Sequence, residues 1–272
     1  MFSGGKTLSM NWQTALLISG IIGGILPHAE NDIFLIKSLR ELYLPNTDQF
    51  TEVSLKQVLQ GVIWDLDGVI IDSMRIHYDS LIKVLQKYNC SISQHEFRGY
   101  FGRTNFEVLQ EILGDQLTND QIADLAEQKQ KIFEDNAVDQ AQLFQGVEQW
   151  LQYFQKLAIP QAVASSNAKK FIETIATRLN IRHYFNVLLS AEELTSKPDP
   201  LVFLESARLI GSAPRHSLVF EDALAGVEAA RRAGMKCVAI TTTNDLGALS
   251  QADLIIQHYD DLSPEKLYQV MN

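Results

Sequence analysis

The sequence predicts a doubly wound α/β fold, in which helices cover both faces of a Rossmann-like parallel sheet and a smaller helical domain follows the first strand. Beyond residue 60, short apolar segments alternate with longer helical stretches, as in β-α-β units. Polar side chains follow several of these apolar segments, and ligands of such sheets bind beyond the carboxyl ends of the strands. Residues 76–143, which separate the first strand from the second, have helical periodicity.

The first predicted strand begins at Val62 and ends in two aspartates, Asp65 and Asp67. Side chains at positions i and i+2 of an extended chain point to the same side, so both carboxylates can face one pocket. One carboxylate could attack phosphorus while the other donates a proton to the leaving oxygen and later accepts one from water. Gly68 would permit a strained turn after the pair. Because two aspartates at this spacing also fit a simple turn, the pair alone does not establish catalysis.

Three further strands are predicted at residues 161–164, 185–189 and 218–220. Each is followed, directly or after a short loop, by polar side chains that could serve a common site: Ser165, Ser166, Asn167, Lys197, Glu221 and Asp222. Taken singly, these residues also fit structural roles, as helix N-caps, a solvated loop lysine and carboxylates that complement a helix dipole. Their joint position at the carboxyl ends of strands favours one shared site.

Between Gly61 and Ile256 the chain resembles the haloacid dehalogenase superfamily, in particular its magnesium-dependent phosphatases and β-phosphoglucomutases. The resemblance rests on four motifs that occur in order: Asp65-Leu66-Asp67-Gly68-Val69-Ile70, Ser165, Lys197-Pro198 and residues 220–230. It implies that Asp65 is the nucleophile and Asp67 the general acid and base. It also implies that Ser165 and Lys197 hold the phosphoryl group. Dehalogenases of the superfamily do not need an acid two residues after the nucleophile, so Asp67 favours phosphoryl transfer.

The cofactor that the resemblance implies is Mg²⁺, a hard cation that takes oxygen ligands. The expected ligands are the carboxylates of Asp65 and Asp222, the backbone carbonyl of Asp67, water and the substrate phosphate, with Glu221 beside them as a further candidate. Manganese or cobalt could occupy the same site. A helix expected from about Asn167 would add backbone N–H groups that attract the phosphate.

Residues 76–143 are expected to form a helical cap, because apolar residues recur there at helical spacing. Three stripes are predicted: Leu81, Ile82 and Leu85; Phe106, Leu109, Ile112 and Leu113; and Ile122, Leu125 and Ala126, with Lys129 at a partly polar edge. Such stripes more often form the core of a helical bundle than ligand contacts. In the resembling family this insertion is a mobile lid that excludes water and selects the substrate. Hinges are expected near Ser73–Met74 and Gln145–Gly146.

Two positions in the cap bear on the choice between a phosphatase and a mutase. His77 lies where β-phosphoglucomutases carry a histidine that couples cap closure to proton transfer. Those mutases also grip the distal phosphate with an arginine, and the matching position here is Asn105; the nearby Arg103 is the candidate for phosphate binding. We therefore expect a phosphatase that hydrolyses a small phosphorylated metabolite, such as a sugar phosphate, through an aspartyl-phosphate. The alternatives are a β-phosphoglucomutase-like mutase and a non-catalytic protein that binds a phosphorylated metabolite.

The composition is that of a soluble enzyme, with 46% hydrophobic and 21% charged residues among 272. A net charge of -10 argues against a nucleic-acid partner, because binding nucleic-acid phosphates requires a basic patch. The two cysteines, Cys90 and Cys237, suggest neither a disulfide framework nor a zinc site. A cytoplasmic location is expected, and the oligomeric state is left open.

The expected domains are a core of residues 61–75 and 144–272, the cap of residues 76–143, and an N-terminal extension of residues 1–60 whose role is unknown. Within the extension, the apolar residues 15–26 resemble the central region of a signal peptide, and export is the alternative to a cytoplasmic location. This run is shorter than the roughly twenty residues of a membrane span, so a membrane association is not expected. Residues 31–44 have the pattern of an amphipathic helix.

Overall fold

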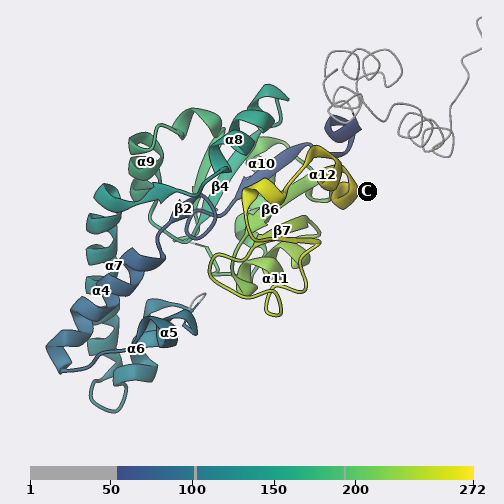
Figure 1. Cartoon of the computed structure of the whole chain (residues 1–272). Helices are drawn as coiled ribbons and strands as arrows, with labels where there is room; N and C mark the ends of the chain where they lie inside the picture. The colour runs from purple at the N-terminus through teal and green to yellow at the C-terminus, as the bar shows by residue number, and fades with distance from the viewer. Residues whose placement is uncertain (1–53, 101–102, 193) are drawn as a thin grey trace, which may run out of the picture. The chain divides into compact units, whose positions relative to one another are not determined.

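The structure, a computed structural model, describes residues 54–100, 103–192 and 194–272 (Figure 1). The apolar segment at residues 15–26 and the amphipathic helix expected at residues 31–44 lie outside the described residues. Within the described ranges, no helix is both long enough and apolar enough to cross a membrane.

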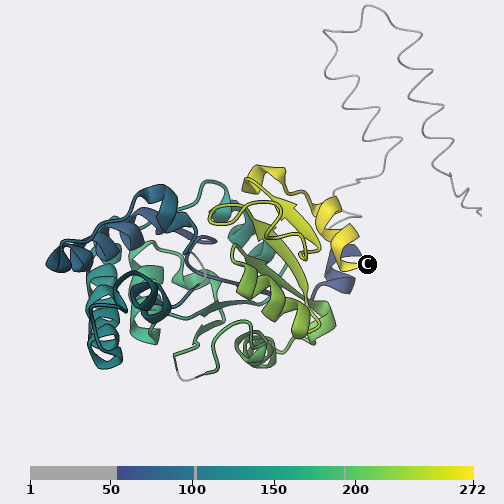
Figure 2. The same ribbon diagram turned by 90° about the horizontal axis from the view of Figure 1, so that it is seen from below.

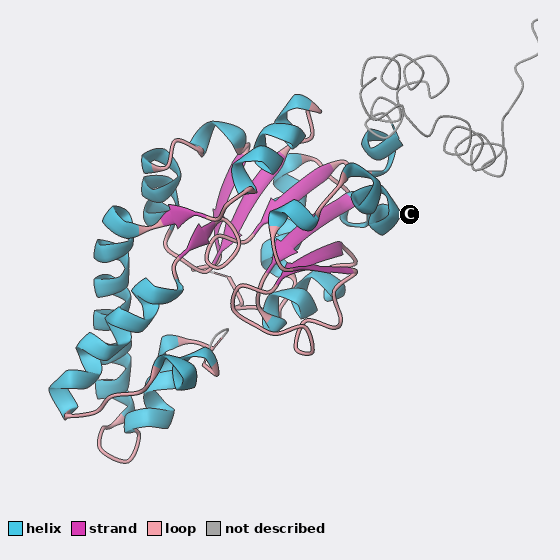
Figure 3. Ribbon diagram, viewed as in Figure 1, coloured by secondary structure: helices cyan, strands magenta, loops and turns pink. Residues whose placement is uncertain are grey.

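A six-stranded parallel sheet forms the centre of the described unit, in the order β5-β4-β1-β6-β7-β8 (Figure 3). The chain moves from β1 outward to β4 and β5, and then returns to build β6, β7 and β8 on the other side. The order of strands therefore reverses at β1, and ligand crevices form at such reversal points. The doubly wound sheet predicted from the sequence is confirmed, with the strands β1 (Gly61–Trp64), β4 (Gln161–Ser165), β5 (Val187–Ser190), β6 (Ser217–Glu221), β7 (Lys236–Ile240) and β8 (Leu254–Ile256).

Neighbouring side chains of β1 enter different hydrophobic cores, because side chains alternate between the two faces of a sheet. Val62 and Trp64 pack on the face that also holds Phe154, whereas Ile63 packs on the opposite face with Phe203. All five side chains are fully buried. Helices cover both faces: α8 (Val147–Lys156), α9 (Lys169–Arg178) and α12 (Pro264–Met271) on the first, and α10 (Leu201–Ile210) and α11 (Leu224–Arg232) on the second.

The structure differs from the sequence-based expectation in several places. Strands β7 and β8 were not predicted, and β5 begins at Val187 because a short turn occupies residues 182–184. The helix expected from about Asn167 begins at Lys169. Residues 54–58 are helical, and Leu55 and Leu59 are buried in the core on the α8 face, although these residues were assigned to the N-terminal extension. The core packing therefore starts before residue 61.

Between the first and second strands of the main sheet, the chain forms helices α4 (Met74–Leu85), α5 (Gln94–Arg98), α6 (Asn105–Leu113) and α7 (Asn119–Gln140), which we call the cap helices. A short antiparallel pair, β2 (Ile71–Asp72) and β3 (Gln142–Leu143), joins the entry and the exit of this segment. Helix α7 packs along both α4 and α6 (Figures 1 and 2). Leu81, Leu109 and Leu125, one from each predicted stripe, share a hydrophobic cluster of their own. The cap helices thus have a core of their own, while Phe133 and Ala137 of α7 join the core of the sheet on the α8 face.

Candidate active site

A cavity of about 520 Å³ lies where the cap helices meet the carboxyl ends of β1, β4 and β6. It contains most of the site residues predicted from the sequence. The polar and charged residues of its lining come from both parts of the unit and include Asp65, Asp67, Ser166, Asn167, Lys197, Glu221 and Asp222 from the core, and His77, Arg103, Asn105, Lys129, Gln130 and Glu134 from the cap segment.

Lys197 holds two of the carboxylates together. Its Nζ donates hydrogen bonds of 2.5 Å to Asp65 Oδ1 and to Glu221 Oε1. Burial lowers the pKa of Lys197, but the negative charges of Asp65 and Glu221 outweigh burial and raise it above its ordinary value. Lys197 is therefore ionised across the physiological pH range and places a fixed positive charge beside Asp65.

Glu221 has hydrogen bonds on both carboxylate oxygens. Oε1 accepts from Lys197, and Oε2 accepts from the backbone N–H groups of Asp222 at 2.8 Å and Ala223 at 2.9 Å. Helix α11 approaches so closely that a Cβ on Gly226 would collide with this carboxylate. The arrangement favours Glu221 as the residue that positions Lys197, rather than as the metal ligand expected from the sequence.

The other carboxylates of the core are crowded and buried. Burial raises the pKa of Asp65 to about 7; Lys197 opposes this shift, and the charges of Glu221 and Asp67 add to it. The pKa of Asp222 is raised well above its ordinary value by burial and by the charges of Glu221 and Asp65. Thr243 Oγ1 donates to Asp222 Oδ2 at 2.5 Å and fixes the orientation of this side chain. Excess negative charge in a buried place is what a bound cation would offset.

The donor atoms of this region fit a hard divalent cation. A Cβ on Gly68 would collide with Asp222 Oδ2, so the Asp222 carboxylate lies directly against the loop that follows Asp67. All the candidate donors are oxygens, as magnesium requires. Within the described residues, no three or more side chains of histidine, cysteine, aspartate or glutamate are arranged to hold a metal alone. A cation would therefore draw on the Asp65 and Asp222 carboxylates together with backbone, water and substrate oxygens.

Asp67 is oriented from two sides. Asn167 Nδ2 donates a hydrogen bond to its Oδ2, and His77 Nε2 lies 3.7 Å from its Oδ1. Burial raises the pKa of Asp67, but hydrogen bonds with His77, Ser73 and Asn167, together with the charge that His77 carries when it is protonated, outweigh burial, so the pKa is lowered overall. Ser165 Oγ is buried and accepts hydrogen bonds of 3.2 Å from the backbone N and the Nδ2 of Asn167, which leaves the hydroxyl hydrogen for another acceptor.

Lys129 was not selected as a site residue from the sequence, yet it lines the cavity. Its Nζ lies 2.8 Å from His77 Nδ1, and the His77 ring stacks on Phe133 with 3.6 Å between the ring centroids. Burial lowers the pKa of Lys129 to about 7, against the opposing charge of Asp67. Burial and the charge of Lys129 lower the pKa of His77 to about 4, so this histidine is neutral at pH 7. One signal in the sequence could have indicated this role. Lys129 lies seven residues after Ile122 on an apolar stripe, and a lysine on a buried helix face needs a polar partner.

Arg103 lines the cavity, but its guanidinium is already paired. Its Nη1 donates to Glu111 Oε2 at 2.6 Å, and the group lies over the Tyr100 ring at 5.5 Å from the centroid. Asn105, at the position of the mutase arginine, donates through Nδ2 to Gln130 Oε1 at 3.0 Å. The cap end of the cavity therefore presents amide groups and an arginine whose charge is offset by a glutamate.

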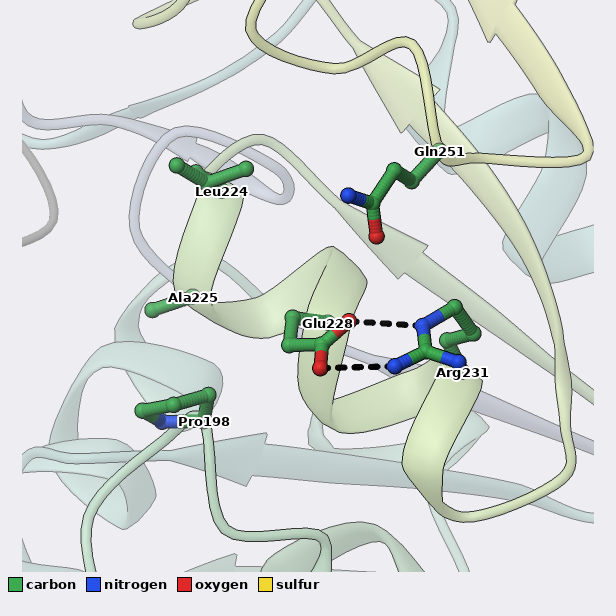
Figure 4. A pocket seen from close by; sticks show the side chains of 6 residues that line it. All are labelled: Pro198, Leu224, Ala225, Glu228, Arg231 and Gln251. Carbon is green, nitrogen blue, oxygen red and sulfur yellow. Dashed lines mark hydrogen bonds and ion pairs between the residues drawn. The ribbon is translucent and has the colours of Figure 1, made fainter.

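A second hollow, of about 750 Å³, lies outside this cavity, between helix α11 and the loops that carry Pro198 and Gln251 (Figure 4). Its charged side chains, Glu228 and Arg231, are paired by two hydrogen bonds. Leu224 in its lining is half exposed. Among the described residues that line this hollow, there is no buried carboxylate or hydroxyl group, so the hollow offers no group for phosphoryl transfer.

Comparisons with known proteins identify the family to which the chain belongs. The sequence profile of the haloacid dehalogenase-like hydrolases matches residues 62–240. The fructose-1-phosphate phosphatase of Escherichia coli is 30% identical over 65% of this chain and 94% of its own length. A phosphorylated carbohydrates phosphatase of Thermotoga maritima is 26% identical over 78% of this chain and 98% of its own length. Among solved structures, β-phosphoglucomutase from Clostridium difficile superposes with a TM-score of 0.67 at 25% identity, covering 79% of this chain and 97% of that one.

Proposed function

Because the chain belongs to the haloacid dehalogenase-like hydrolases, we propose that it is a magnesium-dependent phosphatase that acts on a small phosphorylated metabolite through an aspartyl-phosphate. The observation that carries the proposal is the contact between Lys197 and Asp65, with Asp67 and Asp222 in the same cavity. A nucleophilic carboxylate, a second carboxylate for proton transfer and a fixed positive charge are the groups that phosphoryl transfer to an aspartate requires.

In the first step, an Asp65 oxygen attacks phosphorus, and the bond between phosphorus and the ester oxygen breaks. Because the pKa of Asp67 is lowered in the free protein, Asp67 must take up a proton when the substrate binds; it gives this proton to the departing oxygen, so the product leaves as an alcohol. Lys197 and the Ser165 hydroxyl offset the charge on the phosphoryl oxygens. A bound magnesium ion would supply further positive charge between the Asp65 and Asp222 carboxylates and the phosphate.

In the second step, Asp67 accepts a proton from a water molecule whose oxygen attacks phosphorus. The bond between phosphorus and Asp65 breaks, and inorganic phosphate and the free carboxylate are regenerated. Asp67 is again protonated and ready for the next cycle. Its hydrogen bond with Asn167 and its proximity to His77 hold it in place for both transfers.

A sugar phosphate is the proposed class of substrate. Two of the relatives compared above are named for phosphorylated carbohydrates and for fructose 1-phosphate. A cavity of about 520 Å³ has room for a sugar ring with one phosphate, and the amides of Asn105 and Gln130 at its cap end suit hydroxyl groups.

A phosphosugar mutase is the second candidate, and the contact between His77 and Asp67 favours it. A mutase needs a histidine from the cap that contacts the general acid and base, so that closure of the cap is coupled with proton transfer. The cap end argues for the phosphatase, because Asn105 carries no charge and Arg103 is paired with Glu111. A mutase must hold a second phosphate there.

The test is phosphate release from a panel of sugar 1-phosphates and 6-phosphates, with magnesium or with a chelator. We expect release that requires magnesium, and a loss of at least about a thousandfold in kcat/KM in Asp65→Asn, because that variant lacks the nucleophile. The matched control is Asp79→Asn, the same substitution at an exposed position of α4. Wild-type rates in Asp65→Asn would contradict the proposed nucleophile. Conversion of sugar 1-phosphates into 6-phosphates in place of phosphate release would identify the mutase.

A further inference from the structure

We propose that Gln130, in cap helix α7, is a positioning residue that holds Asn167 and through it the acid and base Asp67. The inference rests on the proposed function, because it assigns Gln130 to the orientation of a group in that mechanism. Gln130 lines the cavity, but Asn167 lies between it and Asp67. Its effect on the reaction is therefore indirect.

The hydrogen bonds form a continuous path from the cap to the core. Asn105 Nδ2 donates to Gln130 Oε1 at 3.0 Å, and Gln130 Nε2 donates to Asn167 Oδ1 at 3.1 Å. Asn167 Nδ2 then donates to Asp67 Oδ2. The path joins helix α6, helix α7, the end of β4 and the end of β1. Asn167 is 5% exposed, so bulk water does not replace these contacts at the core end.

The carboxylate of Glu134 determines the direction of the hydrogen bonds in this path. Gln130 Nε2 also donates to Glu134 Oε1 at 3.0 Å, and an ionised carboxylate can only accept. The amide of Gln130 therefore turns its N–H₂ group toward Glu134 and Asn167. The Asn167 oxygen must then face the N–H₂ group of Gln130, which turns the N–H₂ group of Asn167 toward Asp67 Oδ2. Each amide is locked in one orientation, and Gln130 must donate to Asn167.

Helix α7 thus reaches both oxygens of the Asp67 carboxylate with consecutive residues. Lys129 contacts His77, which faces Oδ1, and Gln130 contacts Asn167, which faces Oδ2. The contact between Gln130 and Asn167 is the hydrogen bond that joins α7 to the polar end of β4. Loss of the Gln130 side chain would leave Asn167 with one partner fewer, and the orientation of Asp67 would be less constrained.

The test compares a sugar phosphate with p-nitrophenyl phosphate. The alkoxide of a sugar needs a proton from Asp67 as it leaves, whereas p-nitrophenolate is a stable anion and needs little help. In Gln130→Ala we expect kcat/KM for the best sugar phosphate of the panel to fall about tenfold, and kcat/KM for p-nitrophenyl phosphate to fall by less than about twofold. The control is Gln128→Ala on the exposed face of α7, whose side chain accepts from Lys87 and which should change neither value.

Two further variants separate positioning from a general disturbance of the cap. Gln130→Glu keeps the shape but cannot donate when ionised, so it should lower the sugar phosphate rate more than Gln130→Ala does; Gln128→Glu controls for the added charge. In an Asn167→Ala background, Gln130→Ala should cause no further change in the ratio of the two rates, because its route to Asp67 is already cut. Equal losses for both substrates, no loss in Gln130→Ala, or additive losses in the double variant would overturn the inference. An inactive wild-type protein would instead overturn the proposed function.

Discussion

At the scale of single residues, Gly68 combines a backbone requirement with a requirement of the site. Its φ of +76° lies in the left-handed region, which glycine adopts without steric cost. A side chain there would also collide with the Asp222 carboxylate. The turn after Asp67 and the placement of Asp222 therefore depend on the same missing Cβ. The sequence suggested only the first reason.

Replacing Gly68 by alanine should weaken metal binding as well as the fold. We expect Gly68→Ala to lose about 1–2 kcal/mol of stability from the backbone alone, and to bind Mg²⁺ at least about tenfold more weakly because Asp222 is displaced. The measurements are thermal unfolding and calorimetric titration with Mg²⁺. Gly211→Ala is the control, because Gly211 has a φ of +74° with no atom near the added Cβ. Equal Mg²⁺ affinity in both variants would disprove the role assigned to Gly68.

At the scale of elements, helix α7 carries a polar function on a buried face. Ile122, Leu125 and Phe133 lie in hydrophobic clusters, and Lys129 lies among them with 3% exposure. The apolar period of the helix is thus interrupted at the point where it meets the cavity. A capping box at Thr118 and Gln121 begins the helix and fixes its first turn. Because the start of the helix is fixed, the position of each later residue of α7 relative to the core is also fixed.

The lowered pKa of Lys129 predicts a pH dependence of stability. An unfolded lysine titrates near 10.5 and the folded one near 7, so the unfolded chain binds more protons between these values. Stability of the wild-type protein relative to Lys129→Met should therefore rise with pH, by about 1 kcal/mol per pH unit between pH 7.5 and 9. Below pH 7 both states are protonated and the difference should level off. Urea unfolding at several pH values measures it.

The control for this experiment is Lys131→Met, which removes an exposed lysine from the same helix. Its stability difference from the wild-type protein should change much less over this pH range. If the difference between wild-type protein and Lys129→Met is also independent of pH, Lys129 is not buried in the way described here.

At the scale of the whole molecule, the site belongs to the unit of residues 51–272. Leu55 and Leu59, at 0% and 1% exposure, are part of its core, and Gln60 N donates to His216 O at 2.8 Å. The helical residues 54–58 are therefore needed by the unit even though the family match begins at residue 62.

Two deletions test this boundary. A protein of residues 51–272 should keep the wild-type kcat/KM, because it retains every residue of the candidate site. A protein of residues 61–272 should lose several kcal/mol of stability, since each buried leucine that is removed costs about 2–5 kcal/mol. Urea unfolding midpoints and phosphate release measure both effects. Equal stability of the two proteins would show that Leu55 and Leu59 do not contribute to the core.

Features that depend on neighbouring residues could be predicted from the sequence, whereas features that depend on distant residues could not. Apolar periodicity and turn residues are local, and they revealed β1, β4, β5 and β6 and the three apolar stripes of the cap. Strand β8 has only three residues, two of them half-buried, and gave no such signal. The antiparallel link between β2 and β3 joins segments about seventy residues apart, and pairing at that distance depends on the packing of everything between them.

The sequence by itself determined the type of sheet, the family and the candidate residues Asp65, Asp67, Lys197 and Asp222, because residue type and position along a strand place a side chain at the sheet's carboxyl edge. Only the tertiary structure decided which of these groups touch. It paired Lys197 with both Asp65 and Glu221, Arg103 with Glu111, and Asn167 with Gln130. Hydrogen bonds and charges act over a few ångströms in space. The partners here come from separate elements, and no local pattern records which of them will meet.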